Sequence, residues 1–353
     1  MKRADPPIIL RETGSLGRIT LNRPRAINAL TLDMVQTMRA ALQDWRADSG
    51  IGSVLIDGAG ERGLCAGGDI RAAWDSIRDG AGADLFWDEE YRLLDTIACY
   101  PKPVVAWMDG LVMGGGVGIS AHASHRIVTE RSAVAMPETI IGFTPDVGGS
   151  YLLSRAPGQL GLRLGLTGGR MSAGDAIHCG FADHCMASDR LTDLAAALRA
   201  TGADAAIAAL AAPPPASPLA THRSWVDAAY AAPSMLDIVT ALRARPEPEA
   251  ADDVAALARR SPTALAVTLR SIRAARALPG LAACLAQERR LVRHMLRQPD
   301  FAEGVRAQVI DKDRNPCWRP ARLEDVDAGR LEAWFGAADV ASDTQGGHRS
   351  PGS

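Results

Sequence analysis

The feature that most constrains the fold is a regular alternation of strand-like and helix-like segments over the first 190 residues. Short apolar or alternating segments, typical of strands, occur at 17–22, 51–58, 103–110 and 124–130. Segments with helical apolar spacing lie between them. Strands separated by helices favour an α/β fold with crossover connections.

Two of the intervening segments are predicted helices, 31–45 and 84–100. In the first, apolar residues recur at helical spacing, and Thr31 precedes them as an expected N-cap. The residues of this apolar stripe are Val35, Met38, Leu42 and Trp45.

The pattern changes after about residue 190. Residues 191–260 are Ala-rich and helical, and "AAPPPASPLA" (211–220) interrupts them as a predicted loop or linker. Further helices are predicted in 261–338. The polar, Gly/Ser-rich stretch 339–353 is predicted to be a disordered tail.

Composition excludes several classes of protein. The chain has 353 residues, 47% hydrophobic, and a net charge of -2, so we expect neither nucleic acid nor a membrane surface as partner. Its six cysteines form no CxxC pair, which argues against disulfides and a cysteine zinc site. No signal peptide and no apolar run of about 18 residues is seen. A cytoplasmic protein without a metal is expected.

Three familiar catalytic motifs are absent or incomplete. "GGSYL" (148–152) lacks the last glycine of a nucleophile elbow. His122 and His125 are three apart rather than in an HExxH pair, which favours surface or core histidines. "GGGVG" (114–118) is followed by Ile119 where a dinucleotide fingerprint needs glycine.

Residues 136–149, "MPETIIGFTPDVGG", are mostly apolar yet contain the carboxylates Glu138 and Asp146. No Lys, Arg or His lies between them. An unpaired buried carboxylate costs several kcal/mol, so two in such a stretch indicate a functional role.

Two glycine-rich turns each follow a predicted strand: "LCAGGDI" (64–70) and "MGGGVGIS" (113–120). Small residues let a ligand approach the backbone, and the first N–H groups of a helix have no internal partner. Two such groups aimed at one carbonyl oxygen would form an oxyanion hole. Tight packing of each turn against the sheet is the alternative.

With "LNRPRAINAL", "KPVVAWMDGLVMGGGVGIS", "LTGGRMSAGDAIHCGFAD" and the C-terminal "DFAEGVRAQVIDKDRNPCWRP", these stretches resemble the 3-hydroxyisobutyryl-CoA hydrolase branch of the enoyl-CoA hydratase/isomerase (crotonase) superfamily. The resemblance covers about residues 8–335. It implies an α/β crotonase (ClpP/crotonase-like) fold of repeated ββα units with a helical C-terminal region. Residues 8–190 would then be the core with the acyl-CoA site.

The resemblance also assigns roles to residues. It implies that the backbone N–H groups of Ala66 and Gly115 polarise the thioester carbonyl, while Asp69 holds its turn. A hydratase has a glutamate where this chain has Gly118, and the other hydratase glutamate matches Glu138. Asp146 stands where hydratases usually have glycine, as in the hydrolase pattern.

The same resemblance implies a substrate-binding set. Glu90 would bind the acyl group, and a solvated helix face is the alternative. CoA would lie along 23–28, which includes Arg25 and Asn28, and along 64–70, which includes Gly67 and Gly68, with Gly114 beside it. A cation for the CoA phosphates could come from Arg23, Arg25, Arg71 or Lys312.

The implied function is hydrolysis of 3-hydroxyisobutyryl-CoA in valine catabolism, with 3-hydroxypropionyl-CoA as a second expected substrate. Glu138 could activate a water or attack the carbonyl directly, and Asp146 would orient Glu138 or the water. No metal or redox cofactor is expected, since CoA is part of the substrate. The alternatives are an enoyl-CoA hydratase or isomerase and a non-catalytic acyl-CoA-binding protein. Some homo-oligomerisation is predicted.

Overall fold

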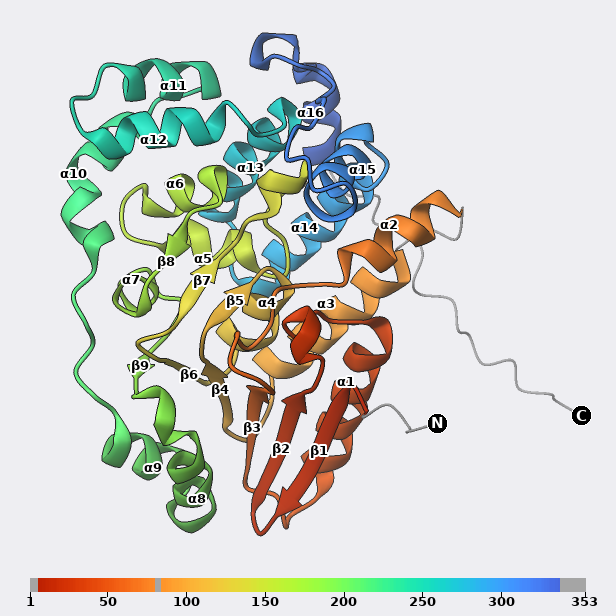
Figure 1. Ribbon diagram of the computed structural model, residues 1–353, viewed down its shortest axis with the longest axis vertical. Coiled ribbons are helices and arrows are strands. Elements are labelled where there is room, and N and C mark those ends of the chain that lie inside the picture. The colour runs from red at the N-terminus through yellow and green to blue at the C-terminus, as the bar shows by residue number, and fades with distance from the viewer. Residues whose placement is uncertain (1–5, 80–83, 337–353) are drawn as a thin grey trace, which may run out of the picture.

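A sheet of mostly parallel strands lies at the centre of the protein. The computed structural model describes residues 6–79 and 84–336. Within those residues, six strands pair in the order β1–β2–β3–β4–β6–β9 (Figure 1). Only β1 and β2 are antiparallel. The strands are β1 (Ile8–Thr13), β2 (Leu16–Leu21), β3 (Ser53–Gly58), β4 (Val104–Met108), β6 (His125–Val128) and β9 (His184–Cys185).

A second, smaller sheet consists of β5 (Leu111–Met113), β7 (Ala133–Ala135) and β8 (Arg170–Met171) in the described part of the chain. β5 pairs parallel with β7, and β7 pairs antiparallel with β8. Gly114 alone separates β5 from the helix that follows it. The second glycine-rich turn is therefore fixed at the end of a paired strand.

Helices surround both sheets. Those up to residue 190 are α1 (Leu32–Ala47), α2 (Ile70–Arg78), α3 (Asp84–Ala98), α4 (Gly115–Ala121), α5 (Gly149–Arg155), α6 (Leu160–Thr167) and α7 (Ala173–His178). Later helices are α8 (Leu191–Thr201), α9 (Ala203–Leu210), α10 (Pro218–Tyr230), α11 (Met235–Arg243), α12 (Pro248–Leu257), α13 (Pro262–Ala275), α14 (Leu281–Met295), α15 (Pro299–Val305) and α16 (Ala328–Phe335). Short turns of helix are η1 (Pro24–Ala26), η2 (Glu138–Ile141), η3 (Ser188–Arg190), η4 (Arg306–Ile310) and η5 (Leu323–Asp325).

The α/β fold with a helical C-terminal region is confirmed. The four predicted strands are β2, β3, β4 and β6, and the two predicted helices are α1 and α3. Thr31 caps α1 as expected, because its side chain accepts a hydrogen bond from the Met34 N–H at 3.3 Å. The predicted loop 211–220 is wrong at its end: Ser217 caps α10, which begins at Pro218.

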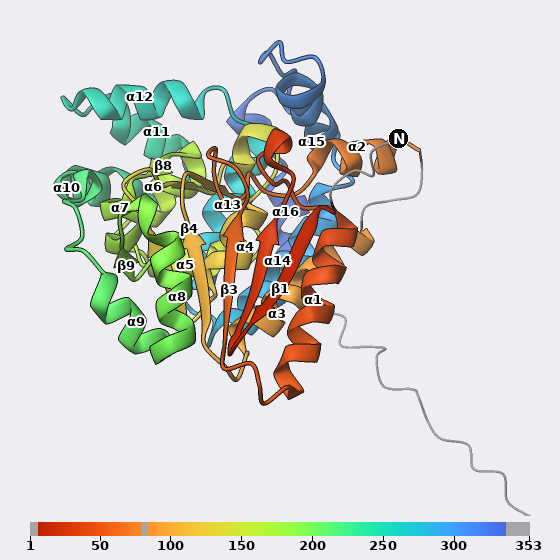
Figure 2. The ribbon, with the colours of Figure 1, turned by 60° about the horizontal axis from the view of Figure 1, so that its bottom comes forward.

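The two faces of the large sheet are covered by different helices (Figure 2). Val54 and Ile56 of β3 belong to the same apolar cluster as the buried faces of α1 and α3. Leu55, on the other face, belongs to a second cluster with Leu194 and Leu198 of α8 and residues of α9. α8 and α9 therefore pack on the large sheet and belong to the same structural unit. The predicted divisions at 190 and 260 stay predictions, and the predicted tail 339–353 lies outside the described residues.

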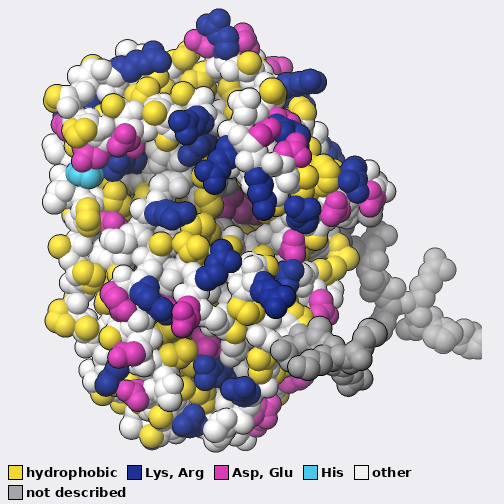
Figure 3. Space-filling model, viewed as in Figure 1, with side chains coloured by type: hydrophobic (Ala, Val, Ile, Leu, Met, Phe, Trp, Pro, Cys, Tyr) yellow, Lys and Arg dark blue, Asp and Glu magenta, His cyan; other side chains and the backbone are white. Residues whose placement is uncertain are grey.

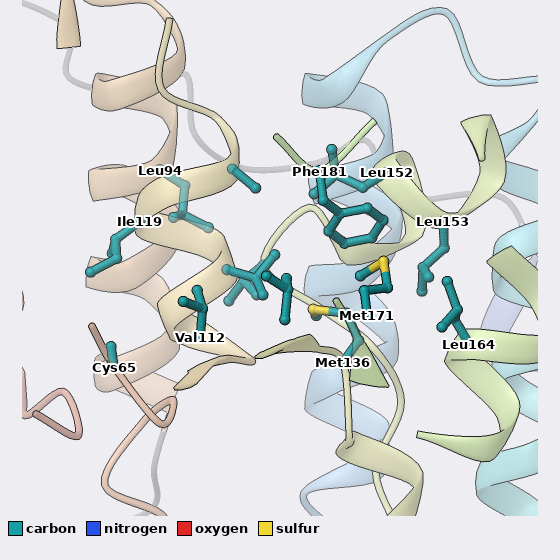
Figure 4. Packing of buried hydrophobic residues seen from close by; sticks show 14 of the residues in the cluster. Cys65, Leu94, Val112, Ile119, Met136, Leu152, Leu153, Leu164, Met171 and Phe181 are labelled. Carbon is teal, nitrogen blue, oxygen red and sulfur yellow. The ribbon is translucent and has the colours of Figure 1, made fainter. Parts of the chain in front are cut away.

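The larger apolar cluster continues from α4 to α5 and α6. Figure 4 shows part of it, with Leu94 and Ile119 on one side, Leu153 and Leu164 on the other, and Met136 between them. This packing fixes the segment before α5, which contains both acids of the "MPE…PDVGG" stretch. No described helix has the length and apolar character needed to cross a membrane.

The C-terminal helices dock directly on this segment. α13 and α14 pack against α5, and α15 packs against η2, whose first residue is Glu138. The approach of α15 is backbone to backbone: a Cβ on Gly304 would lie 2.3 Å from the carbonyl carbon of Ile141. Glycine at 304 is therefore a condition for seating α15 on η2.

We expect Gly304→Ala to lower the free energy of unfolding by about 1–3 kcal/mol, since the added methyl group must push α15 away from η2. Urea denaturation measures this. Gly280→Ala is the matched control, because nothing lies within 4 Å of its would-be Cβ. Equal unfolding free energies for the two variants would contradict the expectation.

Candidate active site

One cavity brings most of the predicted site residues together. Its volume is about 250 Å³, and it lies between the loop after β3, α3, the start of α4, η2 and the turn before α5. Eight predicted residues line it: Ala66, Gly67, Gly68, Glu90, Gly114, Gly115, Glu138 and Asp146. The space-filling view shows acidic atoms in a hollow of this face, with Lys and Arg side chains around it (Figure 3).

Three carboxylates face the cavity from different elements. Glu90 of α3, Glu138 of η2 and Asp146 before α5 are 2%, 7% and 5% exposed. Glu90 Oε1 and Glu138 Oε2 have no hydrogen-bond partner among the described residues. Buried polar atoms are normally paired, so these two oxygens are available to a ligand.

The pKa of each of these acids is raised. Burial, together with the charge of Asp146, raises the pKa of Glu90 and of Glu138 well above the usual range. Burial raises the pKa of Asp146 to about 7, although the hydrogen bond from Trp87 lowers it. Burial thus raises the pKa of both members of the Glu138–Asp146 pair.

Trp87 holds Asp146 within the cavity. The Trp87 Nε1–H donates to Asp146 Oδ2 at 2.9 Å, and its ring contacts Phe143 and Phe301. The sequence interpretation missed this tryptophan, because a tryptophan on the apolar face of a helix has no signal that distinguishes it from core.

The prediction that the Ala66 N–H polarises the thioester carbonyl is wrong. Its N–H donates to the Ile27 carbonyl oxygen at 2.9 Å, so it cannot also donate to a substrate. The N–H groups of Gly68 and Gly115, by contrast, have no acceptor in the part of the chain that the structure describes. A Cβ on Gly115 would lie 3.4 Å from the Gly68 nitrogen, so the two groups are close neighbours. Gly68, rather than Ala66, is the candidate partner of Gly115.

Asn28 does not line the cavity, and its predicted role in substrate binding stays a prediction. Its buried side chain accepts from the Arg23 N–H at 2.9 Å and donates to the carbonyls of Ala59 and Gly63 at 3.1 Å. These bonds hold the loop that continues to Gly68. Asn28 is thus a support of the glycine turn.

Arg25 is also absent from the cavity lining and is exposed at the surface. Among the other candidate cations, Arg23 pairs with Asp69 at 2.9 Å, and Arg71 donates to the Val309 carbonyl at 3.2 Å. Asp69 caps α2 by accepting from the Ala72 N–H, as the structural role predicted for it requires. A role of these cations or of Lys312 in holding CoA phosphates stays a prediction.

The position of the missing hydratase glutamate is filled. A Cβ on Gly118 would lie 2.9 Å from Val147 Cβ and 3.1 Å from Leu94 Cδ2. Gly118 is buried within α4, and Val147 directly follows Asp146. A larger side chain at 118 therefore collides with the residue next to the second acid.

A scan against family models matches residues 16–335 to "Enoyl-CoA hydratase/isomerase". The chain belongs to the enoyl-CoA hydratase/isomerase family. Curated members that it resembles include "3-hydroxyisobutyryl-CoA hydrolase, mitochondrial" of Gallus gallus, 38% identical over 90% of this chain and 86% of that protein. "3-hydroxyisobutyryl-CoA hydrolase 1" of Arabidopsis thaliana is also 38% identical, over 93% of this chain and 91% of the relative.

Solved structures of family members agree with the fold. A carnitinyl-CoA dehydratase from Mycobacterium thermoresistibile has a TM-score of 0.92 at 49% identity, over 97% of this chain and all (100%) of that one. An enoyl-CoA hydratase from Rhodobacter sphaeroides has a TM-score of 0.87 at 43% identity, over 94% and 97%. The titles of these structures and the names of the curated relatives thus specify different reactions within one family.

The raised pKa of Asp146 predicts a pH-dependent stability. Between its ordinary value of 3.8 and about 7, the folded protein keeps a proton on Asp146 that the unfolded chain has released. The free energy of unfolding of the wild type therefore falls as pH rises through this window. Asp146→Asn removes this dependence, so we expect it to gain about 2–4 kcal/mol relative to the wild type from pH 4 to pH 7.

Denaturant unfolding of both proteins across this pH range measures the difference. The difference should level off above pH 8. A constant difference from pH 4 to pH 8 would show that Asp146 is ionised throughout.

Proposed function

We propose that this family member hydrolyses the thioester of 3-hydroxyisobutyryl-CoA to 3-hydroxyisobutyrate and CoA, and that 3-hydroxypropionyl-CoA is a second substrate. The curated relatives named as 3-hydroxyisobutyryl-CoA hydrolases support it along most of the chain. The main observation in its favour is that Glu138 and Asp146 line one cavity, while Val147 fills the space at position 118, where a hydratase has its second acid.

The same observation decides between hydrolysis and hydration. Hydration across a double bond uses two acid/base carboxylates, one of which would stand at position 118. Here that residue is Gly118, and its surroundings leave no room for a glutamate. The titles of the two solved structures favour dehydration or hydration. Identity over the whole chain, however, does not show which residue stands at a single position. The residue at position 118 is glycine, which favours hydrolysis.

Carbonyl polarisation is the first requirement of thioester hydrolysis. We assign it to the N–H groups of Gly68 and Gly115, which lie close together on the cavity wall without protein acceptors among the described residues. Two such donors stabilise the negative charge that develops on the carbonyl oxygen. Any side chain at 115 would approach Glu90 Oε1 to 2.4 Å, so glycine keeps this space for the substrate.

Glu138 supplies the nucleophile, and two routes fit its unpartnered Oε2. It takes a proton from a water that attacks the carbonyl carbon, or it attacks directly and forms a mixed anhydride that water then cleaves. In either route the C–S bond breaks and the thiolate receives a proton. In the reactive form of the pair Glu138 is ionised and Asp146 carries the proton, so that Asp146 can orient the water and supply that proton.

Glu90 would bind the acyl group. Its Oε1 is buried, has no partner in the described residues, and lies against Gly115. The hydroxyl of a 3-hydroxyacyl group could donate to this oxygen if Glu90 is ionised or accept from it if Glu90 is protonated. The proposed reaction needs no metal or redox cofactor.

A place in valine breakdown follows from the proposed substrate. The vertebrate relatives are named as mitochondrial, while a cytoplasmic location stays the prediction for this chain. Self-association also stays a prediction.

We expect Glu138→Gln to lower kcat for thiol release from 3-hydroxyisobutyryl-CoA at least about 100-fold, because the amide is neither base nor nucleophile. Thiol release is measured with a chromogenic disulfide on both proposed substrates. Glu249→Gln on α12 is the matched control, since Glu249 contacts His222 at 3.6 Å and does not line the cavity.

Wild-type activity in Glu138→Gln would remove this residue from the chemistry. Loss of the crotonyl-CoA absorbance on adding wild-type enzyme, without thiol release from either hydroxyacyl-CoA, would favour the hydratase alternative. Binding of acyl-CoA without any turnover would favour a binding protein.

A single turnover in ¹⁸O-labelled water tests for the anhydride route, which label in Glu138 would establish. The anhydride route leaves label in the Glu138 carboxylate when water attacks the Glu138 carbonyl of the anhydride, whereas attack on the acyl carbonyl leaves the label in the released acid. The water route puts label only in the released acid. Mass spectrometry of the peptide containing Glu138 reads the result, and Glu90 in its own peptide is the internal control.

A further inference from the structure

A further buried carboxylate, Glu288, contacts the segment after Asp146 but does not line the cavity. It belongs to α14 of the C-terminal region and is 0% exposed. The Gly148 N–H donates to its Oε2 at 2.7 Å, and the Ser150 N–H donates to its Oε1 at 2.8 Å. The Ser150 hydroxyl also donates to Oε1. The three donors come from a segment about 140 residues earlier in the chain.

These donors belong to the tight turn that presents Asp146. The Asp146 carbonyl accepts from the Gly149 N–H at 2.6 Å, which closes a turn over Val147 and Gly148. Both central residues have positive φ, 50° and 78°. Turns of this kind normally use glycine, asparagine or aspartate there, and a β-branched residue at positive φ is an outlier. Contacts outside the turn must therefore keep Val147 in this conformation.

Three contacts do so. Glu288 holds the N–H groups at 148 and 150, and the His122 Nε2–H donates to the Val147 carbonyl at 2.9 Å. The Val147 side chain fills the space over Gly118. Of these contacts, only Glu288 comes from the C-terminal region, so it also ties the start of α5 to α14.

We propose that Glu288 is a positioning residue for the proposed thioester hydrolysis: by holding the 146–149 turn from α14, it keeps the Asp146 carboxylate in the cavity. Asp146 has one side-chain hydrogen bond in the described structure, from Trp87, so its place depends on the backbone that carries it. Glu288 is not a catalytic residue, because it does not line the cavity. The expected change in kcat rests on the proposed function, whereas the expected displacement of Asp146 does not.

The titratable groups that interact with Glu288 lie on α3, on η2, in the turn before α5 and on α14 itself. Asp146, Glu138 and Tyr91 of α3 lie close enough to interact with its charge, as does Cys284 on its own helix. Burial lowers the pKa of His122 to about 4, so that side of the turn is neutral near pH 7. Burial raises the pKa of Glu288 to about 8, against the three hydrogen bonds that lower it. All three partners donate, so both oxygens of Glu288 act as acceptors, which the nitrogen of an amide cannot do.

The test compares Glu288→Gln with a matched control on the same helix. The amide keeps the shape, but its NH2 group must face an N–H or O–H donor. We expect kcat for thiol release to fall about 100-fold, with KM within about threefold of wild type, because a small displacement of Asp146 affects the reacting geometry more than binding. Ser150→Ala removes one of three donors and should change kcat less than about tenfold.

Gln287→Leu is the control. Gln287 is buried at the neighbouring position of α14 and donates to the Ser271 carbonyl and hydroxyl at 3.1 Å, away from the turn. We expect it to lower the melting temperature without lowering kcat below that of the wild type by more than about threefold. If Gln287→Leu loses as much kcat as Glu288→Gln, or if Glu288→Gln keeps the wild-type kcat, Glu288 is a structural residue only.

Crystal structures of the variants provide a readout that does not depend on activity. In Glu288→Gln the Asp146–Trp87 hydrogen bond should be lost, while in Gln287→Leu it should stay near 2.9 Å. If the wild type hydrolyses no acyl-CoA, the proposed function fails, and this structural comparison still decides the positioning role. Glu288→Asp serves in the same way if the glutamine variant does not fold, since the shorter side chain cannot reach all three donors.

Discussion

The site depends on the pairing of two glycine-rich loops through their backbones. The Cys65 N–H donates to the Leu111 carbonyl at 3.2 Å, and the Met113 N–H donates to the Cys65 carbonyl at 2.9 Å. These bonds continue the small sheet into the loop after β3. Because of this ladder, Gly68 and Gly115 become neighbours although 47 residues (115 − 68) separate them in the chain. Side chains at the contact points would break the pairing: a Cβ on Gly116 would lie 2.5 Å from the Cys65 carbonyl oxygen.

Around this ladder the protein buries carboxylates in unusual number and gives them few charged partners. Glu90, Glu138, Asp146 and Glu288 are all nearly inaccessible, and their hydrogen bonds within the described residues come from Trp87, Ser150 and backbone N–H groups. Such an arrangement costs folding free energy, which is offset by the apolar clusters on both faces of the sheet and by the docking of α13–α15. The C-terminal region is therefore part of the site's support.

Much of the fold and the identity of the acids could be predicted from the sequence. Buried parallel strands appear as continuous apolar runs, and carboxylates within an apolar, Gly/Pro-rich stretch are conspicuous. The interpretation missed β1, whose residues are mostly exposed, and the short strands of the second sheet, which are too short to show a period. Glu288 did have a signal, because it lies at helical spacing with the buried residues Cys284, Leu291 and Val292.

The error at Ala66 and the supporting role of the Asn28 side chain depend on contacts between distant parts of the chain. Which N–H of a turn points into a cavity depends on how the turn pairs with the rest of the chain, and residue 66 pairs with Ile27, 39 residues earlier (66 − 27). Asn28 stands in the segment that the resemblance connects to CoA. Its side chain, however, forms hydrogen bonds with the backbone of Arg23, Ala59 and Gly63. Composition and spacing do not contain this long-range information.

The contact between Gly118 and Val147 also bears on how sequences in this family can change. A glutamate at 118 cannot be accommodated while Val147 occupies its space, and a smaller residue at 147 without that glutamate leaves a gap beside Asp146. Either substitution made alone, at position 118 or at position 147, is therefore disfavoured. Positions 118 and 147 should be inherited together, so that a lineage passes from one reaction type to the other by paired substitutions rather than by gain of one acid.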